Sequence, residues 1–207
     1  MNQGIDEEGA NAMAKKSTKT AAPKVIGKVD AAFSEWERIE MRAMGLLDAK
    51  GNILQHPPAP PQVARKVITN LGVLNEAYDY ALPSSFSRGL SVSLEAGQRI
   101  LYISGTASID DKGVTIYTGD FRAQLWRTYR NITELLAAEG ASWHDIVRTS
   151  CYLRDIERDY DEFNKVRTLF FDCLSVRPVP ASTGIQARLC RSDLLIEIEA
   201  FAFVKGG

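Results

Sequence analysis

Hydrophobic and polar residues alternate along the segment from Leu194 to Val204. A period of two is typical of a β-strand, in which successive side chains point to opposite faces of a sheet. One face of this strand carries Leu195, Glu197, Glu199, Phe201 and Phe203. The other face carries Ile196, Ile198, Ala200 and Ala202. Two carboxylates, about 7 Å apart on such a strand, therefore share a face that is otherwise apolar.

The pair of carboxylates allows two interpretations. Glu197 and Glu199 could lie on a solvated part of a sheet, because a glutamate is rarely buried without a partner. Alternatively, Glu197 lies at a seam between subunits and acts as a general acid or base. In that case burial and the neighbouring Glu199 should raise the pKa of Glu197.

Upstream of this strand, two segments have apolar residues at the three- and four-residue spacing of an amphipathic helix. The first follows Asp120 or Thr118 as a cap and ends at Gly140, and the second runs from Glu157 to Leu174. Strands are predicted at 90–94, 99–104, 114–117 and 146–153, and in the two segments after the second helix. This order predicts an α+β fold, a mixed sheet with two helices packed on one face.

The N-terminal part of the chain has a different character. Residues 1–30 lack periodicity and predict a disordered tail without the apolar stretch of a secretory signal. Residues 31–62 predict a helix over 31–49 and a stiff proline-rich connector. The main domain is expected over 63–207, although 63–85 shows no clear pattern.

The composition of the chain argues against two classes of protein, those that bind nucleic acids and those that span a membrane. The chain has 207 residues, 45% of them hydrophobic, and a net charge of −1, which fits one domain with an appendage. Without a basic stripe we expect no nucleic-acid partner, and no apolar run reaches the roughly 20 residues of a membrane span. The absence of an export signal favours the cytoplasm.

The three cysteines and two histidines give no metal signature. Cys151, Cys173, Cys190, His56 and His144 show no spacing typical of metal ligands. We therefore expect reduced thiols and no metal site.

Five segments in the same order resemble the reactive intermediate deaminase family, also called Rid or YjgF. They are Ile100–Ser108, Leu135–Val147, Thr149–Asp155, Tyr160–Asn164 and Ile196–Ala200, and the resemblance covers about residues 87–204. It implies a chorismate-mutase-like protomer that forms a homotrimer with ligand pockets between neighbouring subunits. It also implies hydrolysis of enamines and imines such as 2-aminoacrylate, without metal or organic cofactor.

The resemblance also assigns pocket residues. The backbone of Gly105 should line the pocket, and Glu197 matches the acidic residue that orients or deprotonates the attacking water. Ser182 and Thr183 match two further substrate-binding positions of the family. The arginine that pairs with the substrate carboxylate in active members is replaced here by Ala181.

A cation from another part of the chain could take over the role of that arginine. The tyrosine and glutamine of the family's first segment fall on Phe86 and Arg88. We expect Arg88 to bind an anionic group of the ligand and Phe86 to stack on its unsaturated part. The alternative is that Arg88 is a solvated side chain at the start of a strand.

Three functions follow from these residues. The first is a Rid-like hydrolase that deaminates an enamine, an imine or a related small unsaturated carboxylate. The second is a trimer that binds a small anionic metabolite without catalysis, which the replacement at Ala181 favours. The third, a chorismatase-like enol-ether hydrolase, ranks last because the large N-terminal domain of those enzymes is missing.

Overall fold

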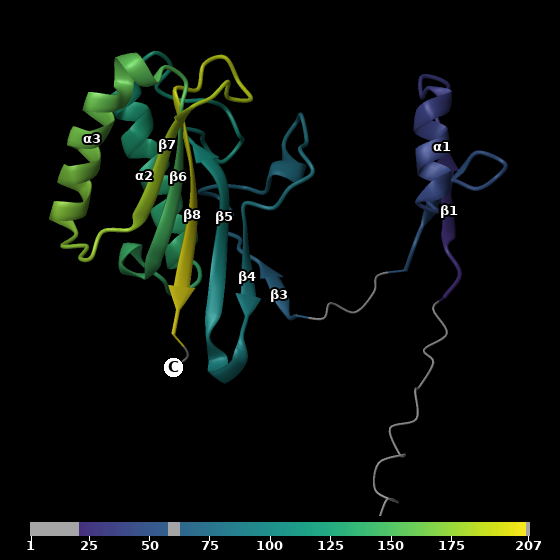
Figure 1. Cartoon of the computed structure of the whole chain (residues 1–207), viewed down its shortest axis with the longest axis horizontal. Coiled ribbons are helices and arrows are strands. Elements are labelled where there is room, and N and C mark those ends of the chain that lie inside the picture. Colours follow the sequence, from purple (N-terminus) through teal and green to yellow (C-terminus); the bar gives the residue numbers. More distant parts are fainter. Residues whose placement is uncertain (1–20, 58–62, 206–207) are drawn as a thin grey trace, which may run out of the picture. The chain divides into compact units, whose positions relative to one another are not determined.

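The computed structural model describes residues 21–57 and 63–205. The chain divides into two compact units, Met1–Pro60 and Pro61–Gly207, and each unit is described here by itself (Figure 1). No helix in the described residues is long and apolar enough to cross a membrane.

The larger unit is built on a six-stranded sheet with the strand order β3-β4-β5-β8-β6-β7. Only β6 and β7 pair in parallel, and the other neighbours are antiparallel. The strands are β3 (Arg65–Val67), β4 (Gly89–Ser93), β5 (Arg99–Ala107), β6 (Ile146–Leu153), β7 (Ala181–Gln186) and β8 (Ile196–Val204). The predicted α+β class with a mixed sheet is confirmed.

Two long helices, α2 (Phe121–Ala137) and α3 (Ile156–Cys173), cover one face of the sheet (Figure 1). The Asp120 side chain caps α2 by accepting a hydrogen bond from the backbone N–H of Ala123 at 2.9 Å, and Asp155 caps α3 in the same way. Both helices therefore begin within one or two residues of their predicted starts.

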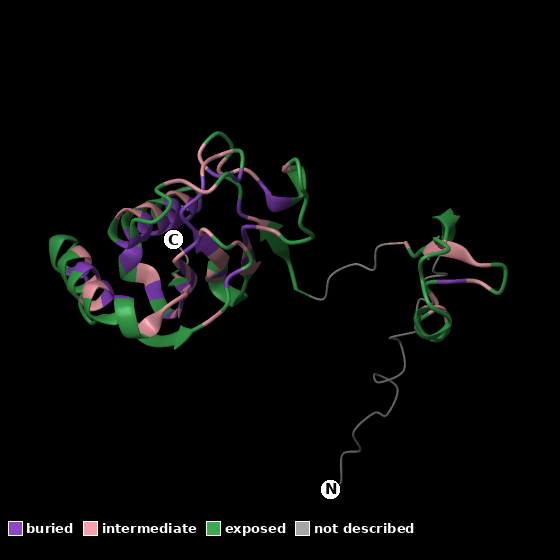
Figure 2. Cartoon of the chain, turned by 90° about the horizontal axis from the view of Figure 1, so that it is seen from above, coloured by how far each residue is buried: buried purple, intermediate pink, exposed green. Residues whose placement is uncertain are grey.

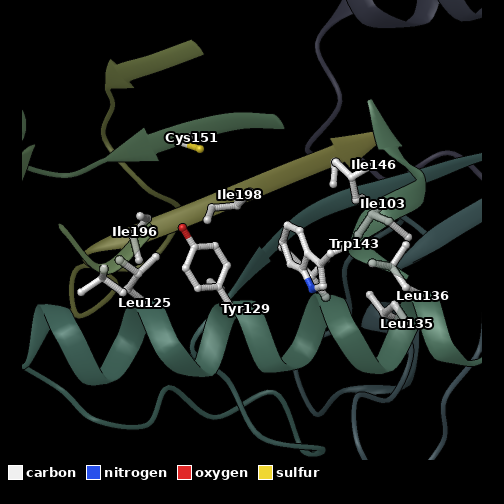
Figure 3. Packing of buried hydrophobic residues seen from close by; sticks show 14 of the residues in the cluster. Ile103, Leu125, Tyr129, Leu135, Leu136, Trp143, Ile146, Cys151, Ile196 and Ile198 are labelled. Carbon is white, nitrogen blue, oxygen red and sulfur yellow. The ribbon is translucent and has the colours of Figure 1, made fainter. Parts of the chain in front are cut away.

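The hydrophobic core lies between these helices and the sheet (Figures 2 and 3). From α2, Leu125 and Tyr129 point toward Ile196 and Ile198 of β8 (Figure 3). Tyr129 also stacks on Phe170 of α3, with ring centroids 4.3 Å apart. The apolar side of β8 predicted from its alternation is thus the side covered by helices, and Glu197 and Glu199 lie on the open side.

Two details of the larger unit differ from the sequence-based expectation. Residues 114–117 form no strand; only an isolated bridge joins Ile109 to Thr115. The stretch without a pattern contains β3 and a short 3-10 turn at Ala77–Asp79. The structure of residues 114–117 and of residues 63–85 depends on contacts with distant parts of the chain, which the local pattern of hydrophobic residues does not predict.

The smaller unit contains β1 (Lys24–Lys28), α1 (Glu35–Ala43) and β2 (Asn52–Gln55), with β1 and β2 antiparallel. The predicted tail over 1–30 is therefore wrong for Lys24–Lys28, which pair with a strand that the sequence did not indicate. The N-terminal helix is shorter than the predicted 31–49. Most of the predicted connector, residues 58–62, lies outside the described residues.

Candidate functional site

A cavity of about 740 Å³ opens in the larger unit where β5, β8 and the residues just before β4 meet the loops that follow Ala77, Ile109 and Leu189. Its size lies within the roughly 300–1,000 Å³ of pockets that bind small organic ligands. Four of the six residues predicted for the site line it, namely Phe86, Arg88, Gly105 and Glu197.

Glu197 rests directly on the backbone of Gly105. A β-carbon placed on Gly105 would lie 2.0 Å from Oε1 of Glu197 and 2.9 Å from its Cδ. The pairing of β5 with β8 shifts register between Ile103 and Thr106, so a β-bulge brings Gly105 under the carboxylate. A residue without a side chain is required here because the carboxylate occupies the space of a Cβ.

The surroundings of Glu197 raise the pKa of its carboxyl group. Partial burial raises the pKa of Glu197, the negative charge of Glu199 raises this pKa further, and the positive charge of Arg88 lowers it. Glu199 itself accepts a hydrogen bond from the Tyr152 hydroxyl at 2.8 Å. A carboxyl group whose pKa is raised above its ordinary value is suited to proton transfer.

Arg88 is a buried residue, only 4% exposed, so its interpretation as a solvated side chain is wrong. Its backbone N–H donates to Oε2 of Glu76 at 3.0 Å. Its guanidinium carbon lies 5.0 Å from the centroid of the Tyr80 ring and 5.1 Å from that of Phe86. Two aromatic rings and a backbone bond therefore fix this cation at the cavity wall.

The guanidinium of Arg88 keeps part of its hydrogen-bonding capacity. Nε donates to the Asn75 carbonyl at 3.3 Å and Nη2 donates to the Tyr80 hydroxyl at 2.7 Å. Because arginine has five N–H donors, three have no partner in the described parts of the chain, where no carboxylate lies within ion-pair distance either. A buried cation with unused donors is suited to binding a carboxylate.

Ser182 and Thr183, the other two predicted residues, do not line this cavity. Ser182 faces the helices and accepts hydrogen bonds from Thr149 at 3.0 Å and Arg167 at 3.2 Å. Thr183 lies on the open face of the sheet, where its hydroxyl accepts a hydrogen bond from Arg148 at 3.3 Å. Within one chain they are not part of the same site as Glu197.

Several residues at the cavity were missed by the sequence-based prediction. Tyr80 belongs to the stretch without a pattern, and Lys112, Arg191 and Asp193 belong to loops. Their clustering follows from the loop conformations, which no motif encodes.

The arrangement combines an anion-binding arginine with a carboxyl group that can transfer a proton. The Phe86 ring, 42% exposed, adds an apolar surface beside the arginine. Among the described residues no group of three or more His, Cys, Asp and Glu side chains is placed to hold a metal ion. The groups present are suited to acid and base chemistry on an anionic, unsaturated molecule.

Comparison with known proteins identifies the family. The family model described as endoribonuclease L-PSP, which corresponds to the Rid/YjgF proteins, matches residues 85–204. The chain therefore belongs to this family, and the matched region contains β4 to β8 with both long helices.

Individual relatives agree with this assignment. A RutC family protein of Pyrococcus horikoshii is 33% identical over 113 residues, which are 55% of this chain and 85% of the relative. The 3-aminoacrylate deaminase RutC of Acinetobacter baylyi is 31% identical over 105 residues, 51% of this chain and 79% of that enzyme.

Solved structures show the same fold. The crystal structure of E. coli TdcF with bound serine has a TM-score of 0.55 at 23% identity and covers 68% of this chain and 99% of its own. The YjgF gene product of E. coli has a TM-score of 0.53 at 24% identity, covering 66% of this chain and 97% of its own.

Proposed function

We propose that this protein is a hydrolase that deaminates an enamine or imine of a small carboxylic acid without a metal or an organic cofactor. One observation carries the proposal: Glu197, with its raised pKa, and the buried Arg88, without a carboxylate partner, line the same cavity. The similarity to a 3-aminoacrylate deaminase over half of the chain supports the same class of reaction.

The reaction needs one anion-binding group and one group that moves protons. Arg88 binds the substrate carboxylate through its unused N–H donors. An enamine first takes up a proton on carbon and releases one from nitrogen to become an imine, and water then adds to the carbon of the C=N bond. Glu197 accepts a proton from this water and passes it to the nitrogen, and it passes the remaining hydroxyl proton to the departing nitrogen as the C–N bond breaks. The products are an oxo acid and ammonia.

The test is the release of ammonia and the loss of 2-aminoacrylate or of imines generated in the reaction vessel by an amino acid oxidase. Glu197→Gln should lower the catalysed rate by about 10²-fold or more, the usual contribution of a general acid or base. Arg88→Ala should abolish ligand binding. The control is Glu95→Gln, since Glu95 is exposed in the turn between β4 and β5 and does not line the cavity.

A non-catalytic role is the second candidate, and Ala181 is the observation that favours it. Position 181 lies on β7 next to Arg148 of β6 and offers no charged side chain to a ligand. A metabolite-binding protein should bind small unsaturated carboxylates through Arg88 and leave every imine of the panel intact. Binding that depends on Arg88 without any turnover would therefore replace the hydrolase by this alternative.

The open face of the sheet supports self-association. It presents Tyr102, Ile185 and Phe203, which are 41%, 45% and 37% exposed. We propose that neighbouring copies cover this face in a homotrimer, which would add residues such as Thr183 to the pocket of another subunit. Light scattering on the purified chain tests the proposal, because a monomeric mass at micromolar concentration contradicts it.

A further inference from the structure

Three cations from three separate segments line the cavity. Arg88 precedes β4, Lys112 lies in the loop after Ile109, and Arg191 lies in the loop before β8. None of the three forms an ion pair within the described parts of the chain. The cavity therefore has two cations in addition to the arginine that would bind a single substrate carboxylate.

Arg191 is fixed close to the ring that also positions Arg88. A guanidinium nitrogen of Arg191 donates a hydrogen bond to the carbonyl of Gly113. Gly113 packs against Tyr80 so closely that a β-carbon there would lie 2.5 Å from the ring. Both guanidinium groups also lower the pKa of the Tyr80 hydroxyl, which burial raises. Two cations are thus held around one tyrosine at the cavity wall.

Neither carboxylate that lines the cavity pairs with these cations. Glu197 and Asp193 form no ion pair within the described parts of the chain. Asp193 instead accepts a hydrogen bond from the Thr115 hydroxyl at 3.1 Å. A ligand with one carboxylate bound to Arg88 would leave the half-buried guanidinium of Arg191 and the exposed ammonium of Lys112 without a carboxylate partner, so both stay available to a second anionic group.

We propose that the site selects dicarboxylic substrates, the imines or enamines of acidic amino acids. Arg88 binds one carboxylate, and Arg191 together with Lys112 binds the second. This inference rests on the proposed function and narrows its substrate class. The reaction stays balanced: the imine of an acidic amino acid and one water give a 2-oxo dicarboxylic acid and ammonia.

The test compares acidic with neutral imines on the full-length chain. D-aspartate oxidase generates imines from D-aspartate and D-glutamate, and D-amino acid oxidase generates them from D-alanine and D-leucine. We expect kcat/KM at least tenfold higher for the acidic pair. Arg191→Gln should lower kcat/KM for the acidic imines at least tenfold and so remove this preference, whereas Arg191→Lys should retain it. Arg188→Gln is the control, because Arg188 lies in the same loop but does not line the cavity.

A binding measurement separates the two levels of the proposal. Calorimetry with maleate and crotonate compares an unsaturated dicarboxylate with a monocarboxylate. If neutral and acidic imines react equally and maleate binds no tighter than crotonate, the selectivity is refuted while hydrolysis stands. If no imine reacts but maleate binds at least tenfold tighter in an Arg191-dependent way, the selectivity stands and hydrolysis fails. Loss of preference in Arg191→Lys as well as in Arg191→Gln would also overturn the role of the charge.

Discussion

Replacing Gly105 by alanine should disable the site while the fold survives. The new Cβ would lie 2.0 Å from Oε1 of Glu197, whereas real Cβ atoms essentially never approach a neighbour closer than 3.0 Å. The carboxylate must therefore retreat by about 1 Å or more, and a displacement of about 1 Å at a reacting group costs about 10²-fold in rate. The free energy of unfolding should fall by less than the roughly 1–3 kcal/mol that overpacking a core costs. The reason is that the atoms displaced by the new Cβ lie at the end of the flexible Glu197 side chain.

Two measurements check this expectation for Gly105→Ala. Imine hydrolysis should fall by about 10²-fold, and urea unfolding should show a loss of about 1 kcal/mol or less. Gly27→Ala is the control, since a β-carbon on Gly27 would meet nothing within 4 Å. Full activity in Gly105→Ala would refute the reasoning, because the carboxylate could not then be required where the structure places it.

Three further predictions concern stability. Burial raises the pKa of Glu197 in the folded protein, so this carboxyl group stabilises the fold below its unfolded pKa, and that contribution is lost as pH rises through the folded pKa. Glu197→Gln should therefore gain melting temperature relative to the parent at pH 7 but not at acidic pH, as thermal unfolding across pH would show. Glu139 is buried and forms ion pairs with Lys66 at 2.9 Å and Arg99 at 2.6 Å. Glu139→Ala should therefore lower the free energy of unfolding in urea by about 1.5–3 kcal/mol, and an unchanged midpoint would contradict this. The buried amide of Asn131 donates to the carbonyls of Ala107 and Ile109 at 2.9 and 3.0 Å, so Asn131→Leu should cost about 1–3 kcal/mol in the same assay, whereas a neutral result would mean that water replaces the amide.

The sequence predicted those parts of the fold whose pattern is periodic. The strand at 146–153 has the predicted bounds, and α2 and α3 begin within a residue or two of expectation, because each element buries one regular face. The short strand β3 was missed, since its three residues are placed by pairing with β4 rather than by their own pattern. The strand at 24–28 was missed for the same reason: it depends on a partner 28 residues or so away in sequence.

The candidate site was predicted in part. Glu197 and Gly105 were each predicted to belong to the pocket, the carboxylate from the alternation of its strand and the family resemblance, and the glycine from the resemblance alone. Their direct contact is known only from the structure. The burial of Arg88 was not, since it depends on Tyr80 and Asn75 in a segment without periodicity. Ser182, predicted as a substrate-binding residue from the family resemblance, does not line this cavity within one chain, because its side chain faces the helices and bonds to Thr149 and Arg167.

The position of β8 in the middle of the sheet has a consequence for how the protein forms during synthesis. This strand, near the C-terminal end of the chain, pairs with β5 on one side and β6 on the other. A nascent chain that has reached only residue 195 lacks the strand joining the two halves of the sheet, so both halves expose unpaired edges until residues 196–204 have left the ribosome. Since Glu197 is carried by that same strand, the acid or base of the proposed reaction takes its place in the step that closes the sheet.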